Sequence, residues 1–221
     1  MANNKKTHRF GDMSISYIVG LGVKLFLLLT PFFVLSVFVS TCDGMEHAER
    51  RKLALRTGLA VVASAAVLYV FGRVIFDMLG ISLNAFRVGA GLVLMLNGID
   101  MVRSSTPKNR THDADNSDPA VVPLAIPTTV GPGTIGTLLV MGASVASRAD
   151  EMDCNKWVFM GTELAMVILA GVGIGATLFF SEAINRVLKD HGVRILSKLT
   201  GMYIVALAAQ VIFDGVSGFL K

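Results

Sequence analysis

The sequence predicts an all-α membrane protein whose six transmembrane helices form two inverted three-helix repeats, with helices 1 and 4 discontinuous. Three observations lead to this fold class. Hydrophobic residues make up 53% of the 221-residue chain and charged residues only 16%, whereas soluble domains carry roughly 25% charged residues. Six apolar stretches reach the length that a bilayer span requires, roughly 20 residues. A polar stretch then divides the chain near its middle, with three apolar stretches on each side.

The expected spans and the polar stretch define the domain organisation. The polar stretch, RSSTPKNRTHDADNSD at residues 103–118, is hydrophilic and of low complexity. We therefore predict a first repeat over residues 1–101, a linker over residues 102–119 and a second repeat over residues 120–221. The six spans are expected at about residues 16–39, 53–76, 81–101, 120–146, 157–180 and 195–219.

The two halves of the chain resemble each other. Pro31 and Pro132 each lie early in a half, with Thr30 and Thr129 near them. They are about 101 positions apart, and Gly91 and Gly201 are about 110 positions apart, close to half of the chain. A repeat with an odd number of spans enters the membrane in opposite orientations in its two copies, as in many secondary transporters. Chance similarity between apolar helices is the alternative explanation.

The distribution of basic residues bears on partners and orientation. Lysine and arginine form short clusters between the apolar spans instead of lining one face, which fits anionic lipid headgroups better than nucleic acid. The loops after the first, third and fifth spans carry more of them than the loops on the other side. We expect a multi-pass protein of a bacterial inner membrane, and by the positive-inside rule both its termini are expected in the periplasm, although the basic N-terminal tail opposes that orientation.

The fourth span contains an unusual concentration of prolines. Pro119, Pro123, Pro127 and Pro132 all lie within DPAVVPLAIPTTVGPGTIGT at residues 118–137. A proline inside a helix costs roughly 3 kcal/mol, and unpaired backbone groups at membrane depth persist only where protein buries them or where they line a polar cavity. We therefore expect an inward-facing helix break over residues 128–134, with a kinked, tightly packed helix as the alternative.

The first span has a matching feature at Thr30-Pro31. If both helices are interrupted, the two breaks are expected to meet near the midplane, where inverted-repeat transporters bind substrate. A half-helix beginning near Pro132 would present free N–H groups and the positive end of its dipole to an anion. Free carbonyls on the other side of the break would suit an ammonium, so a small zwitterionic substrate satisfies both.

Charged residues inside spans are functional candidates by default. Glu163 lies about six residues into the fifth span and could accept a coupling proton; a carboxylate that reaches toward the interface near Lys156 is the alternative. Gly171, Gly173 and Gly175 form a small-residue stripe that is expected to pack helices. No set of nucleophile, base or metal ligands is visible, so we expect neither an enzyme nor a bound cofactor or metal.

Several motifs resemble the MarC family of bacterial integral membrane proteins. The most specific is VVPLAIP at residues 121–127, followed by GPGTI at residues 131–135. GISLNAFRVGAGL at residues 80–92 and SKLTG at residues 197–201 add to the match, which extends from about residue 17 to residue 215.

The resemblance implies six helices in two inverted repeats, in a family that includes transporters of small neutral amino acids. The family usually has Asn-Pro in its first helix, where this chain has Thr30-Pro31. The leading expectation is a secondary transporter of glycine, alanine and, at the upper size limit, serine. A channel or exporter of another small polar solute, and a membrane-embedded partner-binding protein without transport, are the alternatives; the oligomeric state is not predicted. The implied substrate site comprises Thr30, Pro31, Thr129, Gly131, Pro132, Gly133 and Thr134.

Overall fold

The structure, a computed structural model, describes residues 15–42, 44–103, 129–151 and 155–220. Within these ranges the regular structure is helical and no strand is present, as the sequence predicts. The helices are α1 (Ile15–Leu28), α2 (Pro31–Thr41), α3 (His47–Leu79), α4 (Leu83–Arg103), α5 (Pro132–Ala143), α6 (Val145–Glu151), α7 (Lys156–Phe179) and α8 (Ser181–Leu220).

Among the described residues, five stretches of helix are long and apolar enough to cross a membrane. They are Ser16–Thr41, which combines α1 and α2, and then His47–Gly72, Leu83–Arg103, Lys156–Phe179 and His191–Leu220. The remaining expected span, residues 120–146, contains the shorter apolar helix α5. Its first part, up to residue 128, and almost all of the linker lie outside the described residues, so the sixth span stays a prediction.

Two helices extend well beyond the spans expected from hydropathy. Helix α3 begins six residues early, at His47, because its first turns carry charged side chains that are compatible with a helix outside the bilayer. It ends where Gly80 takes a left-handed conformation, with φ 62°, and its N–H bonds the Phe76 carbonyl over 3.1 Å. Helix α8 changes direction at Lys189, whose φ of 52° and ψ of 169° are not helical. Its apolar, membrane-length part follows this kink.

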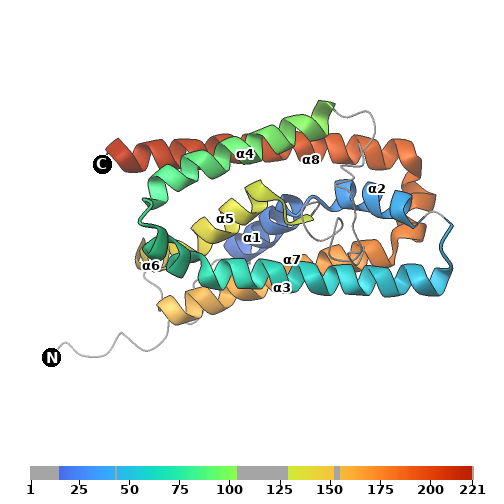
Figure 1. The fold of residues 1–221 in the computed structure, drawn as a ribbon, viewed down its shortest axis with the longest axis horizontal. Helices are drawn as coiled ribbons and strands as arrows, with labels where there is room; N and C mark the ends of the chain where they lie inside the picture. Colours follow the sequence, from blue (N-terminus) through green and yellow to red (C-terminus); the bar gives the residue numbers. More distant parts are fainter. Residues whose placement is uncertain (1–14, 43, 104–128, 152–154, 221) are drawn as a thin grey trace.

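The short helices lie between two layers of long ones (Figure 1). Helices α4 and α8 pack together in one layer and α3 and α7 in the other. Helix α1 packs against α7 and α2 packs mainly against α8, whereas α5 packs against α3 and α4. The interrupted helix of each half of the chain is thus held by long helices of the other half.

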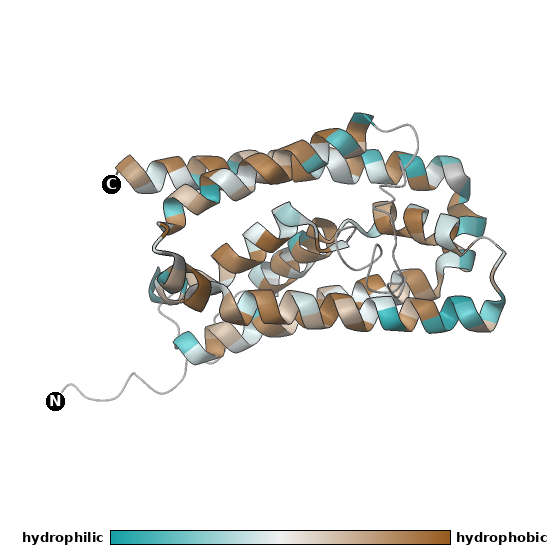
Figure 2. Cartoon of the chain, viewed as in Figure 1, coloured by the Kyte–Doolittle hydropathy of each residue, from teal (hydrophilic) through white to brown (hydrophobic). Residues whose placement is uncertain are grey.

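Hydrophobic residues dominate the middle of the long helices, and hydrophilic residues gather toward helix ends such as the start of α3 (Figure 2). Large apolar side chains are also exposed along these helices, including Leu59 at 72% and Phe213 at 70% exposure. In water such surfaces would be unfavourable, whereas in lipid they face a solvent of matching polarity.

The glycine stripe on α7 packs helices, as expected. A Cβ atom built at Gly171 would lie 2.7 Å from a Val62 methyl group of α3, and Gly175 lies against Gly58 of the same helix. Gly173 faces a different neighbour, the α1 helix. Small residues therefore let the α3 and α7 backbones approach closely, which is how membrane helices gain packing contacts.

Candidate functional site

The first helix is interrupted at the expected place. Helix α1 ends at Leu28, and Pro31 is the first residue of α2, a position where its fixed φ and missing N–H cost nothing. Between them, Thr30 has φ 53° and ψ 54°, in the left-handed region. That conformation is uncommon for a β-branched residue and costs roughly 1–3 kcal/mol. The strain lies at the break itself.

The second break has a similar construction. Gly131 is extended, with φ −76° and ψ 173°, and Pro132 begins α5. Val130 and Gly131 are non-helical, so a new helix starts at Pro132, within the expected break at residues 128–134; whether it interrupts a longer span stays a prediction. The upstream prolines of this span lie outside the described residues.

The two breaks are in contact. The Thr134 hydroxyl, in the first turn of α5, donates a hydrogen bond to the Leu28 carbonyl at the end of α1 over 3.3 Å. Both residues are buried, at 4% and 1% exposure. The last carbonyls of a helix have no intrahelical donor, so a side chain from the other half of the chain supplies one. The end of α1 and the start of α5 therefore meet, as expected; their position at the bilayer midplane stays a prediction.

Polar groups of both half-helices converge at this junction. The N–H groups of Gly133 and Thr134, like those of Phe32 and Phe33, belong to first turns and lack intrahelical acceptors. Each first turn also carries the positive end of a helix dipole. The Thr30 hydroxyl oxygen is buried and has no hydrogen-bond partner among the described residues. The junction therefore contains buried hydrogen-bond donors that have no acceptor within their own helix.

The predicted site residues do not all face the junction. Thr129 and Gly131 are buried beside it, whereas Pro132 is exposed. Gly133 lies against α4, and a Cβ atom built on it would be 2.7 Å from the Leu94 Cα atom. Gly133 can therefore offer its N–H group to a ligand, but its Cα side is occupied by a neighbouring helix.

A small apolar cavity adjoins the junction. Leu25, Leu28 and Leu29 line one side, and apolar side chains of α3, α5 and α7 complete the wall. The cavity offers space for an aliphatic group rather than for a charge. In this conformation the polar groups of the junction are closed over by protein.

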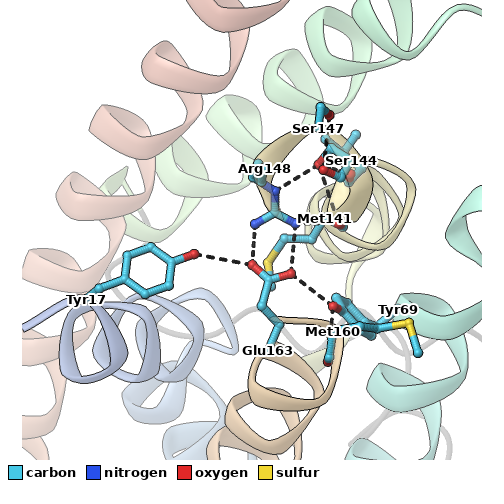
Figure 3. Close-up of polar contacts among 9 residues, drawn as sticks. Tyr17, Tyr69, Met141, Ser144, Ser147, Arg148, Met160 and Glu163 are labelled. Atoms are coloured by element: carbon cyan, nitrogen blue, oxygen red, sulfur yellow. Dashed lines mark hydrogen bonds and ion pairs between the residues drawn. The ribbon is translucent and has the colours of Figure 1, made fainter. Parts of the chain in front are cut away.

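Glu163 lies at the centre of a polar cluster beside the C-terminal half of α3 (Figure 3). Its carboxylate is fully buried and pairs with both terminal nitrogens of Arg148, on α6. The Tyr69 hydroxyl donates to it over 2.9 Å and the Tyr17 hydroxyl over 3.4 Å. Burial excludes the alternative in which this carboxylate reaches out toward Lys156. The proton-coupling role stays a prediction.

The sequence analysis did not identify these partners of Glu163. The sequence places Arg148 just beyond the fourth expected span, where a loop is expected, and a basic residue in a loop is a weak signal by itself. Tyr17 and Tyr69 carried no signal, because single tyrosines are common in membrane helices. Four chain segments had to be placed together before the cluster could be recognised.

A second arginine-glutamate cluster lies at the other end of α3. Arg50 Nη1 lies 3.0 Å from Glu182 Oε1, and His47 Nδ1 lies 2.7 Å from the same oxygen. Arg50 also donates from Nη2 to the Cys42 carbonyl over 3.0 Å. The hydrogen bond with His47, followed by the charges of His47 and Arg50, holds the pKa of Glu182 below its usual value. Among the described residues, no group of three metal-binding side chains is close enough to hold an ion.

These features define an α-helical integral membrane protein with two proline-initiated helix breaks in contact. The chain belongs to the MarC family: the model for MarC family integral membrane proteins matches residues 15–220. It is 28% identical over 214 residues to the "UPF0056 inner membrane protein MarC" of Escherichia coli O1:K1 / APEC, covering 92% of this chain and 96% of that relative. The same-named proteins of Escherichia coli strain K12 and Shigella flexneri match equally well. No solved structure matches the chain.

Proposed function

We propose that this chain is a secondary transporter of small neutral amino acids in the bacterial inner membrane, and that it binds them at the junction of the two breaks. The observation that carries this proposal is the hydrogen bond from Thr134 to the Leu28 carbonyl, which joins the breaks. Glycine, alanine and, at the upper size limit, serine are the proposed substrates.

The junction supplies complementary groups for a zwitterion. The N–H groups of Gly133 and Thr134, at the positive end of α5, would bind the carboxylate. The Leu28 carbonyl would accept from the ammonium once the Thr134 hydroxyl releases it. The side chain would enter the adjoining apolar cavity beside Leu25 and Leu29. Because that cavity is small, a methyl group fits and a leucine side chain does not.

The proposal includes six spans arranged as inverted repeats. Reciprocal packing supports it, since α1 and α2 pack against α7 and α8 while α5 packs against α3 and α4. Similar helix breaks at Thr30-Pro31 and Gly131-Pro132 support it further. The proposed periplasmic location of both termini rests on the distribution of basic residues. A reporter active only in the periplasm, fused to Lys221, should be active; an inactive fusion would reverse the orientation.

Uptake by proteoliposomes tests the proposed activity. Liposomes with purified protein should accumulate labelled glycine when a proton gradient is imposed, and empty liposomes should not. Unlabelled alanine and serine should compete, whereas leucine, phenylalanine, lysine and glutamate should not. Equal competition by leucine and alanine would contradict the small-zwitterion site. Flux that equilibrates but never exceeds the external concentration would favour a channel, and no flux of any substrate would favour a partner-binding protein.

A further inference from the structure

Two arginines bind the far ends of the half-helices that follow the breaks. Arg50 donates to the carbonyl of Cys42, the C-terminal cap of α2. Arg148 donates from Nη2 to the Met141 carbonyl, and from Nε over 3.2 Å to the hydroxyl of Ser144, the C-terminal cap of α5. A cation at the C-terminus of a helix complements the negative end of the dipole. Each half-helix thus begins at the junction and ends on an arginine.

Each arginine also pairs with a glutamate in the second half of the chain, and these two pairs differ in burial. Arg148 pairs with Glu163, whose side chain is 0% exposed and accepts from two tyrosines as well. Arg50 pairs with Glu182, whose side chain is 37% exposed. Solvent-exposed ion pairs contribute little to stability, whereas removing one partner of a buried pair is strongly unfavourable. The Arg50 pair is therefore the easier one to open.

The two pairs lie toward opposite ends of the bundle. Arg50 and Tyr69, which contacts Glu163, are both on α3. At 1.5 Å per residue they are separated by roughly 28 Å along the helix, close to the thickness of the hydrocarbon core. The junction of the breaks lies between the two pairs, because α2 runs from the junction toward the Arg50 pair and α5 runs from it toward the Arg148 pair.

The half-helices also differ in how firmly they are packed. Helix α5 is interlocked with its neighbours through glycines: a Cβ atom at Gly136 would lie 2.5 Å from Ala90 of α4, and one at Gly142 would lie 1.8 Å from the Tyr69 carbonyl oxygen of α3. Helix α2 contains no glycine; its buried residues are Pro31, Val34, Leu35, Val37 and Phe38, and their contacts are made by side chains. Side-chain contacts can rearrange more easily than backbone contacts as close as those of α5, so α2 is the half-helix better suited to move.

The start of α2 is suited to act as a hinge. Only Leu29 and Thr30 separate it from α1, and Thr30 holds a strained left-handed conformation. Hinges are typically one or a few element-terminal residues that absorb a large change in φ and ψ. A rotation at Thr30 would relieve its strain and swing the Cys42 end of α2 away from α3.

We propose that α2 is the mobile gate of the transport site and that Arg50, by bridging Glu182 and the Cys42 carbonyl, is the clamp that holds it closed. Arg148 and Glu163 keep α5 fixed while α2 opens. The substrate therefore reaches the junction from the end of the bundle at which Cys42 lies. This inference rests on the proposed function, because a gate requires a site that exchanges its ligand.

Cys42 itself reports on the gate. Its thiol is free and its side chain is 0% exposed in the closed arrangement. With Cys154 replaced by serine, Cys42 is the remaining cysteine of the chain. We expect Glu182→Gln to raise the rate of Cys42 modification by N-ethylmaleimide roughly two- to fivefold, the range for loss of an exposed charge pair. Glu49→Gln, which alters an exposed carboxylate in the first turn of the same helix α3, should leave the rate unchanged.

A cysteine on α5 distinguishes movement of α2 from a loss of packing throughout the bundle. Val140→Cys, made with Cys42 and Cys154 replaced by serine, puts a thiol at a buried position of the fixed half-helix. Its modification rate should be the same with and without Glu182→Gln. An unchanged Cys42 rate in Glu182→Gln, or an equal rise at both positions, would overturn the proposed gate. Neither modification rate depends on uptake. Absence of glycine transport by the parent protein would therefore count against the proposed function, whereas the modification rates would still test the movement of α2.

Discussion

Thr134 and Leu28 lie 106 residues apart in the sequence, yet the Thr134 hydroxyl donates to the Leu28 carbonyl over 3.3 Å. The donor belongs to the first turn of α5 and the acceptor to the last turn of α1. One hydrogen bond thus connects the interrupted helices of the two halves of the chain. In the proposed mechanism the substrate ammonium replaces this donor.

Thr134→Val removes the donor and keeps the side-chain shape. We expect glycine affinity to rise at least several-fold. In the empty site the Leu28 carbonyl loses its partner, and a buried acceptor left unpaired costs about 1–3 kcal/mol; the bound ammonium would remove that cost. Thr137→Val is the matched control, since the Thr137 hydroxyl bonds the Gly133 carbonyl of its own helix. The measurement is the half-saturating glycine concentration in proteoliposomes. Equal effects of the two substitutions would argue against a special role for Thr134.

Gly133→Ala tests the packing of α5 on α4. The added Cβ would lie 2.7 Å from the Leu94 Cα atom, so we expect a loss of about 1–3 kcal/mol from overpacking and a lower melting temperature in detergent. Gly161→Ala on α7 is the control, because nothing lies within 4 Å of its Cβ position, and it should be neutral or stabilising. The added methyl faces α4 and not the junction, so protein that folds should keep the glycine-to-alanine ratio of the parent. A shift of that ratio toward glycine would mean that this side of Gly133 does line the substrate site.

Thr30→Asn tests the strain at the first break. Asparagine tolerates the left-handed region better than a β-branched residue does. We expect a gain of about 1 kcal/mol in stability, measured as a raised melting temperature in detergent. Thr162→Asn, on a regular part of α7, should give no such gain. A loss of stability in Thr30→Asn would mean that the threonine side chain contributes packing that outweighs its strain.

Glu163→Gln tests the predicted coupling proton. Exchange of substrate across the membrane needs no net proton movement, so this variant should lose gradient-driven accumulation and retain exchange. It should also melt at a lower temperature, because Arg148 loses the carboxylate that it pairs with. Loss of both activities, or of neither, would count against a coupling role.

Tyr17→Phe is the control for Glu163→Gln. It removes the Tyr17 hydroxyl, which donates the longest hydrogen bond to the same carboxylate, 3.4 Å, and it changes no charge. It should retain both accumulation and exchange. If it behaves as Glu163→Gln does, the cluster supports the structure of the bundle and carries no proton.

The depressed pKa of Glu182 predicts how the Arg50 pair depends on pH. The hydrogen bond with His47, and then the charges of His47 and Arg50, favour the ionised carboxylate in the folded protein. Its contribution to stability is therefore full above the unfolded carboxyl pKa and is lost as pH falls through the lower folded value. The difference in melting temperature between parent and Glu182→Gln should be constant from pH 7 to about pH 5 and should vanish in stronger acid. A difference that already disappears at pH 6, where the Glu182 carboxylate is still ionised, would show that its charge does not stabilise the fold.

The sequence by itself determined where the chain can cross a membrane and where its helices must stop. Apolar stretches of sufficient length are visible without any tertiary contact, because lipid requires them. Pro31 and Pro132 each lack a backbone donor and fix φ, so a regular helix can begin at either residue but is disrupted if it runs through them. The family motifs lie in the same local segments. These features are properties of a residue and its immediate neighbours.

Only the tertiary structure decided which polar groups meet. Glu163 gave no sign of whether its partner would be Lys156, a proton or Arg148, because Coulomb and hydrogen-bond energies depend on distances between helices. Likewise, Gly133 looked like part of an open site until α4 was found against its Cα atom. Hydropathy places a residue in lipid or in water but is the same for every rotation of a helix about its axis. Packing against neighbouring helices fixes that rotation, and with it the buried pair, the exposed pair and the contact between the breaks.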